Sequence, residues 1–403
     1  LVEWENTTSH AHDLLEKYGK HLSGPDRALA QEILFGCLRH LYWLDAIIGQ
    51  LRKGKIKLGT QCLLRIGLYQ LLKTQIAEHA AIHETVNLAK KHEKGLVNAI
   101  LRRAQRERSE LEAFAETLPL EDKFSHPQFL IDRWTEQLGE KTTESLCRWN
   151  NQPSHVYARV QRKWQPLDRL MDAVTDQDAR DFISQCSPVS GQPDFIKLPA
   201  GKIPEELLSL GAIYIQDPST ALAPRLLAPQ ENELILDACA APGGKAAYLA
   251  DLMPDTATLF ATDSNDRRIR RMQSNFKRLG VADKVQVSKL DWTAPHDATL
   301  PLFDAILLDV PCSNSGVMQR RVDVRWRLQP YDFDRLAKLQ KTLLAEARNF
   351  LKPGGRIIYS TCSFDSEENQ QLIESSGMEI IAKKSTTPWD DGIDGAFAAV
   401  LKT

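Results

Sequence analysis

Apolar residues recur with two different periods along this chain, and the change of period separates an N-terminal part from a C-terminal part. From residue 1 to about residue 120 they return every three or four positions, as in amphipathic helices. The triplet Gly24-Pro25-Asp26 is a helix start signal. We therefore predict an all-helical domain over residues 1–120. The pattern is clearest in the segments 27–41, 63–72, 83–90 and 95–104.

The period changes at about residue 211, where short apolar runs begin to alternate with helical patterns up to residue 403. Expected helices lie between the strands, notably at 264–279 and 331–350. Alternation of this kind indicates a Rossmann-like, mainly parallel sheet, in which ligands bind at the carboxyl ends of the strands. The strands predicted for this seven-stranded sheet are 234–238, 257–263, 285–290, 303–310, 356–361, 378–383 and 396–402.

Residues 121–210 have a weaker pattern. A helix is expected to start within 125–134, the stretch 155–160 alternates like a strand, and 167–174 has helical spacing. Prolines at 188, 193, 199 and 204 mark loops. We interpret this region as a small α/β connector, with an RRM-like fold as an open alternative. The fold class expected for the whole chain is multidomain, α followed by α/β.

The composition is that of an ordinary globular protein of 403 residues, with 42% hydrophobic and 26% charged residues. No apolar run is long enough to span a bilayer and no secretory leader is visible, although a missing segment before Leu1 stays an open alternative. The seven cysteines are odd in number and form no Cys-x-x-Cys pair, which argues against a disulfide framework or a structural zinc site. We expect a cytoplasmic, monomeric protein without metal or membrane partner.

Basic residues gather in three runs, at 52–57, 90–108 and 319–327, although the net charge is only −2. One such run is most simply a solvated surface, but three together favour an anionic polymer as partner. The arginines expected to contact this nucleic acid are Arg102, Arg103, Arg106, Arg320, Arg321 and Arg325.

The stretch 234–245, Leu-Ile-Leu-Asp-Ala-Cys-Ala-Ala-Pro-Gly-Gly-Lys, is typical of a strand followed by a ligand-binding loop that opens a helix. Gly243 and Gly244 are expected to let the backbone approach a ligand, and a helix start presents free N–H groups. Acids end three consecutive strands, at Asp237, Asp263 and Asp291. Asp263 is well placed to accept hydrogen bonds from ribose hydroxyls, and Asp291 is expected beside an adenine.

These acids favour S-adenosylmethionine as the cofactor. Their charge would repel a pyrophosphate, whereas the sulfonium of S-adenosylmethionine is cationic. The Gly-x-Gly-x-x-Gly fingerprint of NAD binders is also missing, which disfavours an NAD-dependent oxidoreductase. The residues predicted to bind the cofactor are Cys239, Ala240, Ala241, Pro242, Gly243, Gly244, Lys245, Asp263, Asp291 and Asp309.

Two of the seven cysteines differ from the others. Cys312 and Cys362 each follow an apolar strand and have polar neighbours, in Asp-Val-Pro-Cys-Ser and Ser-Thr-Cys-Ser. The remaining five are interpreted as small hydrophobic residues, which is the usual role of a buried cysteine. Two thiols at the cofactor edge of one sheet favour catalysis.

A thiol beside a methyl donor suits methylation of a pyrimidine at carbon 5. This carbon is a poor nucleophile in the aromatic ring, but thiolate addition at carbon 6 makes an enamine whose carbon 5 accepts a methyl group. A second thiol could then help to remove the carbon-5 proton and expel the first. Asp309 could hydrogen-bond the ring nitrogen and the exocyclic amine, which gain charge during addition.

Three motifs carry a family resemblance. Asp-Ala-Cys-Ala-Ala-Pro-Gly-Gly-Lys245, Asp-Val-Pro-Cys-Ser313 and Ser-Thr-Cys-Ser363 resemble those of the RNA cytosine-5 methyltransferases of the Sun/nucleolar-protein family. The helical part resembles the NusB-type RNA-binding domain through Ile-His-Glu-Thr-Val-Asn87 and Gly-Leu-Val-Asn-Ala-Ile-Leu-Arg102. The layout is similar to the bacterial Sun/Fmu-type enzymes that methylate 16S ribosomal RNA.

This resemblance implies three domains and the roles of several residues. The domains would be NusB-like over 1–120, the connector over 121–210, and an S-adenosylmethionine-dependent methyltransferase over 211–403. Cys362 would be the nucleophile and Cys312 the cysteine that releases the product. Asp309 would contact both base and cofactor, and Lys245 would face the active site. The implied partner is small-subunit ribosomal RNA.

Two other protein classes are alternatives to this expectation. A non-catalytic RNA-binding or ribosome-assembly protein could retain a methyltransferase scaffold, and it stays open as the alternative. A DNA cytosine methyltransferase is disfavoured, because those enzymes typically carry the nucleophile on the Pro-Cys motif and here two thiols are present.

Overall fold

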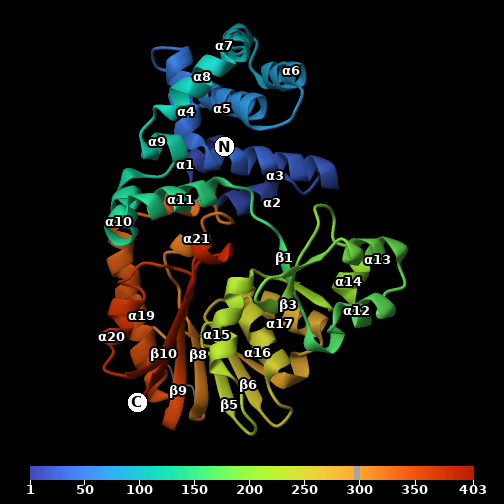
Figure 1. Ribbon diagram of the computed structural model, residues 1–403, viewed down its shortest axis with the longest axis vertical. Coiled ribbons are helices and arrows are strands. Elements are labelled where there is room, and N and C mark those ends of the chain that lie inside the picture. Colours follow the sequence, from blue (N-terminus) through green and yellow to red (C-terminus); the bar gives the residue numbers. More distant parts are fainter. Residues whose placement is uncertain (295–299) are drawn as a thin grey trace. The chain divides into compact units, whose positions relative to one another are not determined.

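The computed structural model describes residues 1–294 and 300–403 (Figure 1). The chain forms two compact units. The first holds residues 1–153 together with 318–328, and the second holds 154–317 and 329–403. The helical part continues to Asn151, and the connector groups with the large sheet. The domain boundaries expected at 120 and 210 stay predictions.

The first unit is helical, as predicted. Its core is built from the apolar stripes of the middle helices, with Leu44, Leu64, Leu68 and Leu101 fully buried. This periodic burial explains why the helical spacing of the sequence was informative. The helices are α1 (Val2–Asn6), α2 (Ala11–Tyr18), α3 (Gly24–Arg39), α4 (Leu41–Leu51), α5 (Leu58–Lys73), α6 (Glu78–Leu88), α7 (Lys94–Arg106), α8 (Arg108–Glu116), α9 (Leu120–Phe124), α10 (Gln128–Leu138) and α11 (Glu140–Asn151).

The segment 318–328 belongs to the first unit although both of its ends continue into the second. It contains the short helix α18 (Val324–Arg327). Val322 packs in a cluster of the first unit, and Asp323 accepts a hydrogen bond from the Ala11 amide at 2.8 Å. The Trp326 indole donates to the Leu38 carbonyl at 3.0 Å. The segment is thus an integral part of the helical core.

The second unit contains the predicted seven-stranded sheet, in the order β10-β11-β9-β8-β5-β6-β7. All neighbours are parallel except β11, which runs antiparallel to β9 and β10. The expectation of a Rossmann-like, mainly parallel sheet is confirmed. The strands are β5 (Leu234–Asp237), β6 (Thr258–Asp263), β7 (Val285–Lys289), β8 (Phe303–Asp309), β9 (Leu351–Thr361), β10 (Glu379–Thr386) and β11 (Ala396–Lys402).

Helices cover both faces of this sheet (Figure 1). Successive strand residues alternate between the two cores, so that Ile235 packs in one and Leu236 in the other. The first face is covered by α15 (Leu222–Leu227), α16 (Gly244–Leu252) and α17 (Asp266–Leu279). The second is covered by α19 (Pro330–Asn349) and α20 (Gln370–Glu374). The short α21 (Pro388–Asp391) lies between β10 and β11 in the chain.

The connector forms a separate antiparallel sheet in the order β2-β3-β1-β4. The strands are β1 (Tyr157–Val160), β2 (Ser187–Val189), β3 (Gln192–Lys197) and β4 (Ile213–Ile215). Its helices are the 3-10 turn η1 (Arg162–Trp164), α12 (Leu167–Ala173), α13 (Gln177–Ser184) and α14 (Glu205–Ser209).

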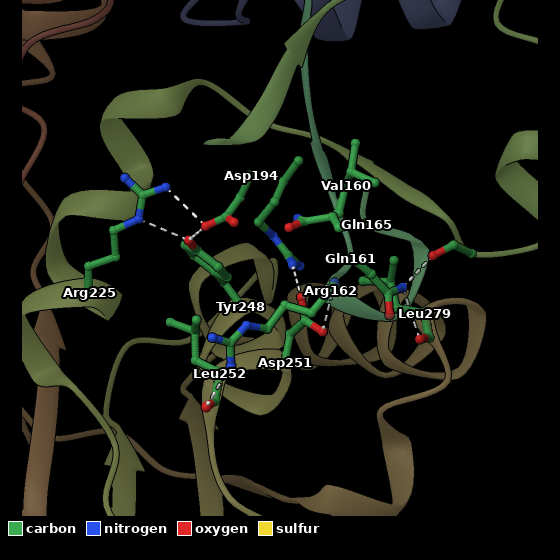
Figure 2. Close-up of polar contacts among 12 residues, drawn as sticks. Val160, Gln161, Arg162, Gln165, Asp194, Arg225, Tyr248, Asp251, Leu252 and Leu279 are labelled. Carbon is green, nitrogen blue, oxygen red and sulfur yellow. Dashed lines mark hydrogen bonds and ion pairs between the residues drawn. The ribbon is translucent and has the colours of Figure 1, made fainter. Parts of the chain in front are cut away.

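Buried polar contacts fix the connector to the large sheet. The fully buried Arg159 donates to Asp251 at the end of α16 at 2.8 Å. Figure 2 shows the second contact, in which Asp194 of β3 accepts hydrogen bonds from Tyr248 of α16 and from Arg225. Because α16 begins in the loop that follows β5, these contacts hold the helix that carries Lys245.

Candidate active site

Polar and thiol side chains line the carboxyl edge of the sheet. They follow five parallel strands, β9, β8, β5, β6 and β7, that are neighbours in this order in the sheet. This order differs from the order in the chain, because β8 and β9 lie between β5 and the antiparallel strands β11 and β10. This is the edge at which such sheets bind ligands. Across the sheet the sequence-predicted residues stand in the order Cys362, Cys312 with Asp309, Asp237, Asp263 and Asp291.

The two candidate catalytic cysteines are in contact. Their Sγ atoms lie 3.2 Å apart, and the Cys362 amide lies 3.4 Å from the Cys312 sulfur. The parallel register explains why the two cysteines lie close together. Asp309 of β8 pairs with Ser360 of β9, and a cysteine follows each of these residues within a few positions. Hydrogen bonding to Cys362 and burial raise the pKa of Cys312 well above the usual value of a thiol. Cys312 therefore stays protonated and can donate to a Cys362 thiolate.

Asn314 lies against both thiol loops. Its side-chain carbonyl accepts from the Cys362 sulfur at 3.2 Å, and its amide donates to the Cys312 carbonyl at 2.8 Å. The residue is in the left-handed region with φ of 60°, which asparagine tolerates better than most residues. One side chain thus links the backbone of one cysteine to the thiol of the other.

A buried carboxylate network lies beneath the two cysteine loops. Glu368 accepts from the Ser313 amide at 2.9 Å and from its hydroxyl at 2.5 Å, and Gln340 donates to the same carboxylate at 2.9 Å. Ser313 also lies 3.2 Å from Ser363, the residue after the other cysteine. Burial raises the pKa of Glu368. The buried Asp365 accepts from the hydroxyls of both Ser313 and Ser363, so the residues that follow the two cysteines are held together by two buried acids.

Sequence reasoning did not identify Glu368 or Gln340. In the sequence, Glu368 lies in the acidic and polar run Asp365-Ser-Glu-Glu-Asn369, which follows the Thr-Cys motif. Such a run is typical of a solvated loop and does not indicate a buried acid. In the structure Asp365 and Glu368 are fully buried instead.

Lys245 and Asp309 form an ion pair on the cofactor side of the thiols, with Nζ and Oδ2 2.8 Å apart. Burial, the largest single cause, would lower the pKa of Lys245, but the charge of Asp309, its hydrogen bond and the charges of Cys362 and Asp237 together raise it. A cation at this position favours a thiolate at Cys362.

Asp237 is a buried acid without compensation. It is 1% exposed, and neither of its oxygens accepts a well-formed hydrogen bond from the residues that the structure describes. Burial and the repulsion of Asp309 raise its pKa to about 8. A buried carboxyl of this kind is satisfied by a cationic or hydrogen-bond-donating ligand.

The other two acids have different surroundings. Asp263 is 5% exposed and lies 3.4 Å from the Arg268 guanidinium, and its Oδ1 accepts from the Asn265 amide at 3.0 Å. Asp291 is exposed and accepts from the Thr293 amide at 2.9 Å. The edge thus becomes more open from Asp237 towards β7.

The glycines of the loop also serve packing, and their role in ligand approach stays a prediction. Gly243 has φ of 97°, and a Cβ there would lie 2.8 Å from Met272 and 2.9 Å from Phe276 of α17. A Cβ on Gly244 would lie 3.0 Å from Tyr214. Cys239, in the same loop, has its pKa raised by burial, as expected of a core thiol.

The arginines predicted to bind RNA have two different environments. Arg102, Arg103 and Arg106 are exposed on α7, and Arg103 also pairs with Glu107 at 2.8 Å. Arg321 is exposed and Arg320 is half-buried. These five remain predictions.

The structure contradicts the expectation that Arg325 contacts RNA. It is fully buried, donates to the Asn151 side chain at 2.6 Å and to the Asn150 carbonyl at 2.9 Å, and burial lowers its pKa to about 9. Its guanidinium supports the helical core and is not available to RNA.

Three family profiles match successive parts of the chain. Residues 1–106 match the NusB family, residues 126–189 match the Methyltr_RsmF/B-like ferredoxin-like domain, and residues 224–396 match the 16S rRNA methyltransferase RsmB/F. The Ribosomal RNA small subunit methyltransferase B of Klebsiella pneumoniae subsp. pneumoniae is 35% identical over 90% of this chain and 84% of that protein. The protein of the same name from Citrobacter koseri is 36% identical with the same coverage.

Solved structures have the same fold. PH0851 superposes with a TM-score of 0.73 at 22% identity, covering 96% of this chain and 92% of that one, a likeness of fold. A methyltransferase homolog protein from Pyrococcus horikoshii has a TM-score of 0.59 at 27% identity, covering 69% of this chain and 96% of its own. No helix among the described residues is long and apolar enough to cross a membrane.

Proposed function

This chain belongs to the family of 16S rRNA methyltransferases RsmB/F, and on that basis we propose that it methylates carbon 5 of a cytosine in small-subunit ribosomal RNA through a covalent cysteine adduct. The observation that carries the proposal is the contact of two thiols, Cys312 and Cys362, at 3.2 Å beside the Lys245–Asp309 ion pair. Methylation of an exocyclic nitrogen or a ribose hydroxyl has no use for a pair of thiols at this place.

The edge residues fit S-adenosylmethionine as the methyl donor. Asp237, buried and without a partner of its own among the described residues, suits a ligand that brings positive charge or N–H donors. Asp263 would accept from the ribose hydroxyls and Asp291 would lie beside the adenine. The cofactor supplies a methyl group activated by its sulfonium.

Cys362 is the proposed nucleophile. The Lys245 ammonium and the Cys312 thiol, which donates a hydrogen bond, both favour a thiolate at Cys362. This thiolate forms a bond to carbon 6 of the cytosine, and the electron pair released makes carbon 5 nucleophilic. Asp309, held by Lys245, would hydrogen-bond the polar edge of the ring that gains charge in this step.

Cys312 is the proposed base of the release step. It is kept protonated by its hydrogen bond to the Cys362 sulfur, by burial and by the charge of Cys362. Once Cys362 has become a neutral thioether, the hydrogen bond and the charge no longer act, and Cys312 ionises more readily. Its thiolate can then take the proton from carbon 5 while the Cys362–carbon 6 bond breaks, which restores the aromatic ring. One pair of thiols thereby serves both halves of the reaction.

The proposal can be tested with a 16S ribosomal RNA transcript that carries tritium on carbon 5 of its cytosines. Methylation at carbon 5 replaces this hydrogen, so tritium is expected in the water in step with methyl incorporation. Methyl incorporation without tritium release would reject carbon 5 as the target. Failure to incorporate methyl groups into both naked transcript and small-subunit particles, with cofactor binding intact, would favour the non-catalytic alternative.

A further inference from the structure

Helix α17 carries an unusual concentration of positive charge. It holds six basic residues and one acidic residue within 14 positions, in a chain whose net charge is −2. The longer α19 on the opposite face of the sheet holds four basic and three acidic residues in 20 positions. Amphipathic surface helices normally mix both signs on the polar face.

The charge lies on the outer face of the helix. The inner face, formed by Ile269, Met272, Phe276 and Leu279, packs on the sheet and is buried. Between these positions the basic side chains point away from the core. The exposed ones are Arg267, Arg268, Arg270, Arg271 and Lys277.

Two of the six basic residues have structural partners. Arg268 donates to the Ala241 carbonyl at 2.7 Å, and Arg278 donates to the Ile213 carbonyl at 3.1 Å. For the other four, Arg267, Arg270, Arg271 and Lys277, no carboxylate of the described part of the chain lies within ion-pair distance. These four residues are called the α17 basic face.

The arginines at the N-terminal end of this face do not stabilise the helix. Arg267 stands in the first turn, where the positive end of the helix dipole disfavours a cation. Arg267 and Arg271 are four residues apart, and Arg267 and Arg270 three apart, so like charges are neighbours on the helix surface. Charges that oppose folding at several positions of one face are explained by an anionic partner that binds there.

The α17 basic face extends from the active-site edge. The helix begins three residues after Asp263, and Arg268 ties its first turn to the cofactor loop at Ala241. At the other end, Lys163 of the connector reaches within 3.9 Å of a Cβ position on Gly280, the C-cap of α17. A helix of this length spans about 20 Å. Helix α17, labelled in Figure 1, therefore leads from the candidate active site towards the connector.

We infer that the α17 basic face, together with Lys163, binds the phosphates of the RNA strand whose cytosine enters the active site. The inference deepens the proposed function and rests on it for the identity of the strand. RNA is favoured over a membrane surface because none of the exposed large apolar side chains of the described residues lies on α17, and an interfacial helix needs an apolar face directed to the lipid.

The test uses the quadruple variant Arg267→Gln/Arg270→Gln/Arg271→Gln/Lys277→Gln in the full chain. Glutamine keeps helix propensity and removes the charges. A matched control, Lys338→Gln/Lys341→Gln/Arg348→Gln, removes three exposed charges from α19. Binding of a 16S ribosomal RNA transcript is measured by filter retention over a series of KCl concentrations, with the melting temperature and S-adenosylmethionine affinity measured in parallel.

The quadruple variant is expected to bind RNA at least about tenfold more weakly, with a salt slope smaller by up to about 3, since each contact to single-stranded phosphate contributes about 0.7. Its melting temperature should stay equal or rise, because repulsion is relieved, and cofactor affinity should not change. The control should bind as the wild type does. If the quadruple variant is unstable, Arg270→Gln/Arg271→Gln gives about half of the slope change.

Equal RNA affinity and salt slope for the quadruple variant and the wild type would overturn the inference, as would equal losses in the control. A wild type that binds RNA through α17 but releases no tritium from labelled cytosine would reject the proposed function and leave the inference standing. If the wild type methylates carbon 5 and the quadruple variant binds and methylates RNA equally well, the inference is rejected and the proposed function stands.

Discussion

The Sγ atoms of Cys312 and Cys362 lie 3.2 Å apart, so that one thiol can donate a hydrogen bond to the other sulfur. The pKa of Cys312 is raised well above the usual thiol value by this contact and by burial, whereas the charge of Cys362 contributes to the raised pKa of Lys245. This asymmetry supports the different roles proposed for the two cysteines. It also makes their variants distinguishable.

Cys362→Ala is expected to abolish methyl transfer, because no other thiol of the described residues lies beside Cys312 at this edge. Cys312→Ala should leave the attack at carbon 6 possible and block release, so that a covalent protein–RNA complex accumulates. The complex is detected by denaturing gel electrophoresis with labelled RNA. A Cys312→Ala protein whose RNA stays non-covalent, or methylation that survives Cys362→Ala, would show that the roles are assigned wrongly.

Glu368→Gln should lower the methylation rate constant about 10- to 100-fold, because a displaced Ser313 loop moves the Cys312 thiol out of reach of the substrate. The amide would present a donor where the carboxylate now accepts three hydrogen bonds. The KM for S-adenosylmethionine should not change, since the cofactor edge starts on the far side of Asp309.

Glu374→Gln is the matched control for this prediction, with an exposed carboxylate on α20 and the same change of side chain. It is expected to behave as the wild type. Equal effects of both variants, or a loss confined to cofactor affinity, would remove the positioning role from Glu368.

The stability of the cofactor-free protein should depend on pH through Asp237. In the unfolded chain this carboxyl ionises near pH 3.9, whereas in the folded protein its pKa is about 8. Between these values the folded state keeps a proton that the unfolded state has lost. The contribution to stability is therefore fully present below about pH 4 and is lost as the pH rises towards 8, by about 1.4 kcal/mol per pH unit.

Asp237→Asn removes this dependence. Urea unfolding of both proteins at several pH values should show the variant gaining on the wild type as the pH rises. Bound S-adenosylmethionine should reduce the difference, because its positive charge stabilises the ionised carboxylate. A difference between the two proteins that does not change with pH would contradict the buried, protonated state of Asp237.

Replacing arginines of the helical unit should affect either RNA binding or stability, depending on the residue. Replacing Arg102, Arg103 and Arg106 by Gln is expected to weaken RNA binding and flatten its salt dependence, with cofactor affinity and stability little changed. Unaltered RNA affinity in a filter-retention assay would remove this role from α7.

Arg325→Leu should act on stability instead. The change leaves the Asn151 side chain and the Asn150 carbonyl without their buried donor, at a cost of about 1–3 kcal/mol for each unsatisfied group. Calorimetry or urea unfolding of the variant measures this loss. A stable Arg325→Leu protein with weakened RNA binding would mean that the residue contacts RNA after all.

The sequence by itself determined the elements and the edge on which the chemistry lies. Helical spacing of apolar residues gave α3, α5, α6 and α7 of the first unit, and short apolar runs gave all seven strands of the large sheet, because burial of an element is visible in its local pattern. Strand ends are visible in the same pattern, so Asp237, Asp263, Asp309 and the two cysteines could be assigned to one edge.

Only the tertiary structure decided which polar residues are buried and what they contact. The sequence of 319–327 is basic and predicts a solvated, RNA-binding run, yet Arg325 lies in the helical core. Glu368 follows a thiol motif in a polar loop, yet it is buried and, together with Asp365, joins the two cysteine loops. The reason is physical: burial of a charge depends on partners distant in the chain, here Asn150 and Asn151 or Ser313 and Gln340, and a local pattern holds no information about them.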